Sequence, residues 1–576
     1  MDINLKNNSI NLQIKLLILL AIIANATGMF FPCLKSMFSP YYGSIAKHIA
    51  LTNNWSDLVL SGHDWLDKPH FPFWITAISF KIFGINSFAY ILPGFIFNLI
   101  GVYYTYRLAR LWYNKETGLV AALFTITALH IMLSSIDVRA EAFLIGQIIP
   151  ACYYWLKYDQ KSKLKYLILG AFFTALAMMT KGIFTLVTIT SGIIALWIVQ
   201  KRLHTILKPK WIIAIILAFL FIAPEIIALY QQFDSQPQKI IFGLTHVSGI
   251  KWFFWGSQFG RFFNTGPISV NHTEDMRYLF FVYTSLWAYL PWWPIFFIAI
   301  FAAIKEKSAA AIFLLASFFI TFIIFSVTKF QIDHYTNILF PFASIISARW
   351  FCNNFLNQDN INSKSVKIIY KIEITLALLL FISVIILAPE ILSGIYRVII
   401  IGLLILALVG FILRKNSHLA FKTIFYPTIA MCITFIFVMF VNGIEYAKYD
   451  AGYQIAKYLN SKSGINVIGY NLDLMSLDFN SKNIYTPLSS IKDTVTPIEL
   501  ETLRQNISAI KKTSTVYLVT TDKDKGLILN NFKNSNLELV LRGTSIEDYM
   551  RGALNPQRLN SKLTNYNIIK LNSSGI

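Results

Sequence analysis

Long apolar runs alternate with short polar segments from the N-terminus to about residue 440. Many of these runs are close to the roughly 20 residues that a helix needs to cross a bilayer. Counting them predicts about thirteen membrane-spanning helices. The predicted spans begin near Leu16, Phe88, Gly118, Phe143, Leu167, Ile183, Ile212, Tyr278, Ala309, Tyr335, Ile372, Val398 and Ile424. The pattern is therefore typical of a mostly α-helical, polytopic membrane protein.

The pattern changes at about Asn442, where the sequence becomes polar. A helical period appears in YDAGYQIAKYLNSK and in ELETLRQNISAIKK, whereas strand-like alternation appears in NVIGYNL, TVYLVTT, LELVLRG and NIIKLN. We predict a transmembrane domain over residues 1–441 and a small α/β domain over 442–576. The second contains neither a Gly-rich phosphate loop nor a nucleophile elbow, so we expect it to support the membrane domain or shape access to it.

Composition agrees with a membrane protein, because only 14% of the 576 residues are charged, whereas soluble domains have about a quarter. The net charge of +21 does not indicate nucleic acid, since many cations lie in alternate loops, as the positive-inside rule expects. These cations include Lys6, Lys15, Arg107, Arg110, Lys115, Lys157, Lys161, Lys163, Lys165, Lys201, Arg202, Lys208, Lys210, Lys305, Lys307, Lys364, Lys367, Arg414 and Lys415. The N-terminus is then cytoplasmic and the C-terminus lies outside. We interpret the first span as an uncleaved helix, the alternative being a secretory signal.

Two loops on the outer side are long, covering residues 32–87 and 231–277. Segments 45–55 and 250–263 within them have amphipathic or aromatic character that favours helices lying flat on the membrane surface. The alternative is simple anchoring by aromatic side chains, but this does not explain the charges in DWLDKPHFPFW, residues 64–74. The two prolines of that stretch disfavour a long, regular helix.

Cations are unexpected on the outer side, so the exceptions are candidates for binding an anion. We single out Lys68, Arg139, Lys181, Arg261 and Lys329. Each alone is better explained as a side chain that extends to the headgroups. Gathered in one cavity at the membrane surface, they would suit a lipid-linked phosphate.

Three acids accompany these cations: Asp67, Asp137 and Glu141. Asp137 and Glu141 are four residues apart, so a helix would place them on one face. Such acids can bind a divalent metal, act as a general base, or pair with a cationic group of a substrate. The alternative is that they only neutralise Lys68 and Arg139.

Several short motifs make the chain resemble the membrane glycosyltransferases of the protein O-mannosyltransferase superfamily, which have the GT-C fold. It is most similar to transferases that add aminoarabinose or related aminosugars to lipid A. LDKPHFPFW matches the acid-Lys-Pro motif of their first outer loop, TKG at 180–182 matches a second motif, and SVTKFQIDHYTNILFP matches a third. Arg261 and Phe262 match more weakly. The likeness covers roughly residues 10 to 440.

The resemblance implies an integral enzyme of the bacterial inner membrane that takes a sugar from undecaprenyl phosphate and transfers it, on the periplasmic side, to lipid A. Lys68, Lys181 and Arg261 would hold the donor phosphate, and Asp67 would lie beside a divalent metal ion where one is used. Other substrate-binding candidates are Arg139, Lys329, His334 and Tyr335, and the catalytic candidates are Asp67, Asp137 and Glu141. Membrane lipids are expected partners. His272 is a weak metal candidate, since no histidine shows a recognised ligand spacing.

One departure from the family lies in the first outer loop, where FSPYYGSIAK replaces an acidic run. Phe38 and Ser39 stand where the family has acids, and Tyr41 replaces an arginine. Either the alignment of this loop with the family is shifted, or Asp137 and Glu141 take the role of the missing acids, or the reaction needs no general base. The last option suits a phosphate acceptor, which is already anionic at neutral pH, whereas a serine or threonine hydroxyl must lose a proton.

Three other functions stay open at this stage. The first is glycosylation of protein hydroxyls or of another envelope glycan with the same kind of donor. The second is transport of a lipid-linked sugar, which usually shows charges near mid-membrane and matching halves, neither of which is seen here. The third is a catalytically silent relative, in view of the altered first loop.

Overall fold

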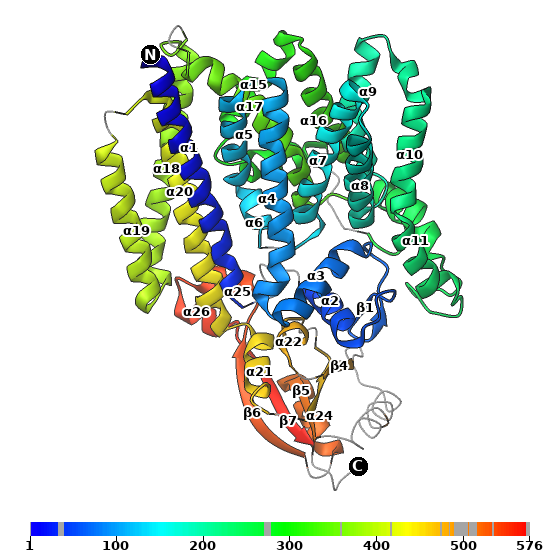
Figure 1. The fold of residues 1–576 in the computed structure, drawn as a ribbon. Helices are drawn as coiled ribbons and strands as arrows, with labels where there is room; N and C mark the ends of the chain where they lie inside the picture. The colour runs from blue at the N-terminus through cyan, green and yellow to red at the C-terminus, as the bar shows by residue number, and fades with distance from the viewer. Residues whose placement is uncertain are drawn as a thin grey trace.

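The computed structural model shows a bundle of long helices with a smaller sheet-containing part at one end (Figure 1). It describes residues 2–32, 40–136, 138–269, 278–357, 360–414, 417–462, 464–472, 475–482, 484–488, 505, 515–532 and 535–571. Several predictions therefore lie outside the described residues: those on Asp137, on Phe38 and Ser39, on His272, and nearly all of the helix predicted at 499–512.

The bundle confirms the mostly α-helical, polytopic class. Seven of the described helices are long and apolar enough to cross a membrane, or up to nine if two bent pairs each count as one span. The helices are α1 (Asp2–Ala26), α4 (Ser87–Trp112), α5 (Lys115–Ile126), α6 (Leu129–Ser134), α7 (Ala140–Lys161), α8 (Leu164–Lys181), α9 (Thr185–Val199), α10 (Pro209–Phe221), α11 (Ala223–Leu229), α14 (Phe280–Ala288), α15 (Trp293–Glu306), α16 (Ala309–Val327), α17 (Phe340–Phe355), α18 (Lys364–Ile391), α19 (Gly394–Leu413) and α20 (Leu419–Phe440).

The predicted count of about thirteen spans is not confirmed. Each predicted span coincides with a helix or a helix pair, but α5, α9 and α17 have only 12, 15 and 16 residues. Two further predicted spans are broken, α10 with α11 by 40° and α14 with α15 by 118°. Apolar composition alone therefore overstates the number of straight crossings, because a buried helix can be equally apolar and shorter.

The first long outer loop folds into two short helices and a hairpin. Helix α2 (Pro40–Thr52) contains most of the predicted surface helix, and strands β1 (Val59–Leu60) and β2 (His63–Asp64) pair before α3 (Phe71–Phe83). The prolines were expected to disfavour a long helix in residues 64–74, and α3 begins only at Phe71, with Pro72 in its first turn. Proline is accepted there because the first N–H groups of a helix have no intrahelical partner.

The second long outer segment is also helical where it is described. After α11 come a π-helical turn η3 (Tyr230–Asp234) and, further on, α12 (Gly249–Lys251), η4 (Trp252–Gly256) and α13 (Ser257–Phe263). These last three elements cover the predicted surface helix at 250–263. They bring Arg261 to the outer end of the bundle.

The C-terminal part contains a five-stranded sheet with strand order β4-β3-β5-β7-β6. The strands are β3 (Ile465–Tyr470), β4 (Ile484–Leu488), β5 (Thr515–Thr521), β6 (Ser535–Gly543) and β7 (Thr564–Leu571), accompanied by α21 (Ala451–Leu459), α22 (Met475–Asn480), α24 (Asp522–Asn531), α25 (Ile546–Gly552) and α26 (Pro556–Asn560). Strand β3 pairs in parallel with β4 and β5, whereas β7 pairs antiparallel with β5 and β6. The predicted strand segments coincide with β3, β5, β6 and β7, and the division of the chain at residue 442 stays a prediction.

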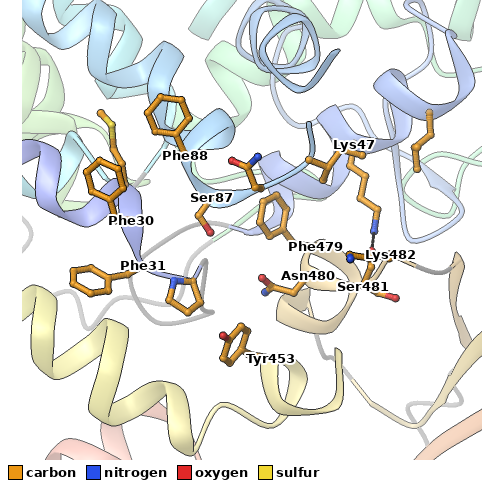
Figure 2. Close-up of a pocket in the computed structure, with 15 residues that line it drawn as sticks. Phe30, Phe31, Lys47, Ser87, Phe88, Tyr453, Phe479, Asn480, Ser481 and Lys482 are labelled. Carbon is orange, nitrogen blue, oxygen red and sulfur yellow. Dashed lines mark hydrogen bonds between the residues drawn. The ribbon is translucent and has the colours of Figure 1, made fainter. Parts of the chain in front are cut away.

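Helix α22 joins the sheet to the outer helices. Lys47 of α2 is buried and donates to the backbone carbonyls of Asp478, at 2.6 Å, and Ser481, at 2.7 Å. The ring of Phe479 lies 5.2 Å from that of Tyr90 in α4. Beside this joint lies a cavity of about 750 Å³, with Phe30, Phe88 and Tyr453 among its lining residues (Figure 2). We call it the junction cavity.

Candidate active site

The candidate site begins at the loop between β2 and α3, which carries Asp67 and Lys68. The Lys68 ammonium lies 2.8 Å from one carboxylate oxygen of Asp67. The other oxygen pairs with the guanidinium of Arg261, which also donates to the Asp67 backbone carbonyl at 3.0 Å. Asp67 therefore links two cations from separate outer segments.

A second acid–base pair comes from two helix ends. Glu141 lies in the first turn of α7 and Lys181 is the last residue of α8; their side chains form a buried ion pair. An acid is favoured at a helix N-terminus and a base at a C-terminus, so the helix dipoles stabilise both placements. The Lys181 ammonium also lies over the ring of Tyr335, 3.6 Å from its centroid, which adds a cation–π contact.

Gly182, directly after Lys181, has a positive φ of 91°. A Cβ at this position would clash with the side-chain amide of Gln258 in α13. The TKG motif thus combines a cation at the end of α8 with a glycine that permits a left-handed backbone and a close approach of α13.

His334 connects the second pair to Arg139. Arg139 Nη1 lies 2.9 Å from His334 Nδ1, and Asp333 Oδ1 lies 3.1 Å from the same nitrogen. The other ring nitrogen, Nε2, lies 3.7 Å from Glu141 Oε2. The adjacent Asp333 accepts a hydrogen bond of 2.7 Å from the His334 backbone N–H.

One cavity, of about 230 Å³, gathers most of the predicted residues; we call it the charged cavity. Its lining residues are Tyr41, Tyr42, Trp65, Asp67, Lys68, Arg139, Glu141, Lys181, Ile332, His334 and Tyr335. Arg261 reaches this group through Asp67. Cations from four separate segments therefore converge on one place.

The structure does not bring Lys329 to this cavity. Its side chain is exposed, and its backbone N–H donates to the carbonyl of Phe262 at 2.9 Å. The sequence prediction also missed residues that do line the cavity, namely Tyr41, Tyr42 and Trp65. In the sequence, Tyr41 was noted only because it replaces an arginine of the family pattern. No feature of the neighbouring sequence indicated Tyr42 or Trp65.

The crowding of cations changes the acidity of the groups in the loop. Burial, together with the neighbouring Arg261 and Lys181, lowers the pKa of the Lys68 ammonium to about 8, even though Asp67 opposes the shift. Burial alone would raise the pKa of Asp67, but Lys68 and Arg261 hold it below its ordinary value. Lys68 is therefore a cation that an anionic ligand would stabilise further.

The residues around Asp67 do not fit the metal ion that the family resemblance allows. Both carboxylate oxygens of Asp67 already face cations. Within the described part of the chain, no group of three or more His, Cys, Asp or Glu side chains is placed to hold a metal ion. We therefore assign no step to a metal.

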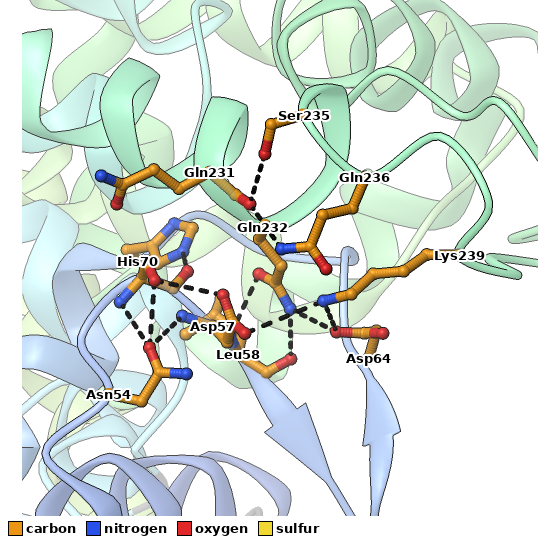
Figure 3. A network of polar contacts seen from close by, with 11 residues as sticks. Asn54, Asp57, Leu58, Asp64, His70, Gln231, Gln232, Ser235, Gln236 and Lys239 are labelled. Atoms are coloured by element: carbon orange, nitrogen blue, oxygen red, sulfur yellow. Dashed lines mark hydrogen bonds and ion pairs between the residues drawn. The ribbon is translucent and has the colours of Figure 1, made fainter.

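A network of polar contacts clamps the Asp67–Lys68 loop to the second outer segment (Figure 3). The His70 backbone N–H donates to Glu225 Oε2 at 3.0 Å, and His70 Nδ1 lies 2.9 Å from Glu225 Oε1, with both side chains fully buried. His70 Nε2 lies 2.8 Å from the Ser56 carbonyl. Gln232 of η3 bonds both the N–H and the C=O of Leu58.

Further along the same network, Lys239 lies 3.0 Å from Asp64 and 3.8 Å from Asp57. The clamp thus holds the loop on both sides of Lys68. Since His70 is two residues from Lys68, we infer that the His70–Glu225 pair positions the ammonium.

Comparison with known proteins agrees with this architecture. The family described as "Dolichyl-phosphate-mannose-protein mannosyltransferase" matches residues 67–227, which include Asp67, Glu141 and Lys181. The crystal structure of ArnT from Cupriavidus metallidurans bound to undecaprenyl phosphate superposes with a TM-score of 0.70 over 98% of each chain, at 13% sequence identity. In sequence, the "undecaprenyl phosphate-alpha-4-amino-4-deoxy-L-arabinose arabinosyl transferase" of Erwinia tasmaniensis is 26% identical over 305 residues.

The chain is therefore similar to these membrane glycosyltransferases in sequence and in fold. A second relative of the same description, from Proteus mirabilis, is 24% identical over 304 residues, and both alignments cover 51% of each chain. The chain thus spans about half the length of the curated transferases it matches, whereas the shared GT-C fold extends over almost all of it. The predicted resemblance is confirmed.

Proposed function

We propose that the chain transfers an aminosugar from an undecaprenyl phosphate donor to a phosphate of lipid A at the periplasmic face of the inner membrane. The observation that carries this proposal is the convergence of Lys68, Arg139 and Lys181 on one cavity. Relatives named for this donor and sugar support the substrate class.

In the proposed reaction, an oxygen of the acceptor phosphate attacks the anomeric carbon of the donor sugar. The bond from that carbon to the donor phosphate oxygen breaks, and its electron pair stays on the departing undecaprenyl phosphate. The leaving group therefore gains negative charge, which Lys68, Lys181 and Arg139 would stabilise. Asp67 and Glu141 hold these cations in place rather than reacting themselves.

The nature of the acceptor is supported by the state of the acids. Asp67 and Glu141 are each paired with cations, so neither is a strong proton acceptor. A phosphate acceptor is already anionic and needs no base, whereas a protein hydroxyl does. Lipid A therefore fits this cavity better than a serine or threonine side chain.

We also propose the orientation, with the N-terminus cytoplasmic and the C-terminus periplasmic. The start of α1 lies at the end of the bundle opposite to the sheet, which accords with the distribution of lysine and arginine in alternate loops (Figure 1). The charged cavity is then on the periplasmic side.

Mass spectrometry of lipid A tests the proposal. A deletion strain should lose an aminosugar-bearing lipid A species, the wild-type gene should restore it, and Lys68→Ala should not, although the variant accumulates in the membrane. An unchanged lipid A profile together with altered glycoproteins would instead identify protein O-glycosylation as the function.

A further inference from the structure

A second, smaller cavity adjoins the charged cavity. It has a volume of about 120 Å³ and is lined by His130, Leu133, Ser134, Arg139, Glu141, Asp333, His334 and Asn337. Three of these residues, Arg139, Glu141 and His334, also line the charged cavity. A donor whose phosphate is held beside Lys68 and Lys181 can therefore extend its sugar past these shared residues into the smaller cavity.

Asp333 differs from the other acids of the two cavities. Asp67 pairs with Lys68 and Arg261, and Glu141 pairs with Lys181. For Asp333, by contrast, the described residues provide no lysine or arginine within ion-pair distance; the neighbour is His334 Nδ1, at 3.1 Å. Its side chain is 45% exposed.

His334 Nδ1 is shared between two groups, Arg139 Nη1 at 2.9 Å and Asp333 Oδ1 at 3.1 Å. When Nδ1 accepts from Arg139 it has no proton to donate to Asp333, so the imidazole cannot serve both groups at once. The hydrogen bond from the His334 backbone N–H engages only one carboxylate oxygen, Oδ1. Asp333 is thus an anion at neutral pH, faces the smaller cavity, and lacks a cationic side chain among the residues described.

We propose that Asp333 binds the ammonium group of the donor sugar and so selects an aminosugar over a neutral sugar. This inference rests on the proposed function and deepens it. Among the carboxylates described in the two cavities, Asp333 is the one that has no lysine or arginine partner. An ammonium group would provide that partner through a charge-assisted hydrogen bond. The other role open to Asp333 is structural, since its side chain bonds the backbone at the start of η6 (Asp333–Leu339).

The substitution Asp333→Asn separates these two roles. An asparagine has the same shape and keeps the side-chain oxygen that accepts from the His334 N–H, so the fold should be retained. It removes only the negative charge. The matched control is Asp522→Asn, which makes the same change at the start of α24, where Asp522 accepts hydrogen bonds from Asn565 and Asn567 of β7.

The experiment measures kcat/KM of the full chain in proteoliposomes with lipid A and two donors, undecaprenyl phosphate aminosugar and its counterpart with a hydroxyl in place of the amine. We expect Asp333→Asn to lower kcat/KM for the amino donor about 10- to 100-fold and for the hydroxyl donor less than about twofold. Asp522→Asn should change neither value.

Two outcomes would overturn the inference while leaving the proposed function intact. An equal loss with both donors would make Asp333 a structural residue of η6, and an unchanged rate with the amino donor would show that the carboxylate does not contact the amine. If the wild-type chain used neither donor, the proposed function itself would fail and the inference with it.

Discussion

The charged cavity and the junction cavity both lie near the outer end of the bundle, but they differ in size and in what their lysines do. The junction cavity is about three times larger, at about 750 Å³ against 230 Å³. Its buried Lys47 donates to two backbone carbonyls and so links α2 to α22. Lys68 and Lys181 instead pair with carboxylates beside open space.

The difference shows why volume is a poor guide to a site in this fold. A lysine that satisfies backbone carbonyls is fully used in holding two elements together. A lysine that shares a carboxylate with other cations keeps positive charge available for a ligand. We therefore expect substitutions in the charged cavity to act on transfer and substitutions in the junction cavity to act on stability.

The strongest test removes the charge of Lys181 together with that of its partner Glu141, so that neither charge is left buried and unpaired. Lys181→Met alone leaves the buried Glu141 unpaired and should cost about 3–5 kcal/mol of stability. The double variant Lys181→Met/Glu141→Gln removes both charges and should unfold near the wild-type temperature. Its transfer rate should still fall about 10²- to 10³-fold, because a cation that stabilises the leaving phosphate is gone. Full activity in the well-folded double variant would contradict the role given to Lys181.

The clamp on the Asp67–Lys68 loop should show the next largest effect when its pair of His70 and Glu225 is broken. Glu225→Ala removes both contacts to His70 and leaves the imidazole buried beside the Ser56 carbonyl. We expect kcat to fall about 10- to 100-fold, because Lys68 is no longer held in its position.

The control for this variant is Gln231→Ala. Gln231 precedes Gln232 in the same π-helical turn but has an exposed side chain. This change should leave transfer within about twofold of wild type. If Glu225→Ala lowered thermal stability but not kcat, the pair would hold the fold and not the ammonium.

The pH dependence of donor binding should report on Lys68. Because burial and nearby cations lower the pKa of Lys68 to about 8, the side chain is protonated below that pH and neutral above it. Affinity for the anionic donor should be constant below about pH 8 and fall by up to about tenfold per pH unit above it. Lys68→Arg should abolish this dependence, since arginine stays protonated. A titration of the dissociation constant in detergent, with an unaltered profile in Lys68→Arg, would exclude Lys68 as the titrating group.

The smallest effect on activity is expected in the junction cavity. Lys47→Met leaves two buried carbonyls without their donor, so it should lower thermal stability by about 1–3 kcal/mol while kcat stays within about twofold of wild type. Lys482→Ala, at an exposed position of the same cavity, should alter neither quantity. A large loss of transfer in either variant would show that the junction cavity takes part in the reaction.

Sequence reasoning predicted the fold class well because hydropathy is the physical requirement that a bilayer imposes on every spanning helix. It did less well on the number of spans, since α5, α9 and α17 are apolar but short. Apolarity does not distinguish a helix that crosses the membrane from one that is packed inside the bundle.

At the candidate site, the short motifs brought Lys68 and Lys181 to attention because charge is rare in this chain. Lys329 belongs to such a motif as well, yet its side chain is exposed. The direction of this side chain depends on the hydrogen bond from the Lys329 N–H to the Phe262 carbonyl, which the sequence does not show. The pair of His70 and Glu225 was missed because its members are 155 residues apart and each is unremarkable alone. Tertiary contacts of this kind need coordinates.

Gly182 places a constraint on how this enzyme can vary. Its φ of 91° lies in the left-handed region, which residues with a Cβ rarely adopt. Any other residue there would strain the backbone directly after Lys181 and displace the side-chain amide of Gln258, so the position of the Lys181 ammonium would change although the lysine itself had not. A search for inactive natural variants should therefore examine this smallest of residues as closely as the charged ones.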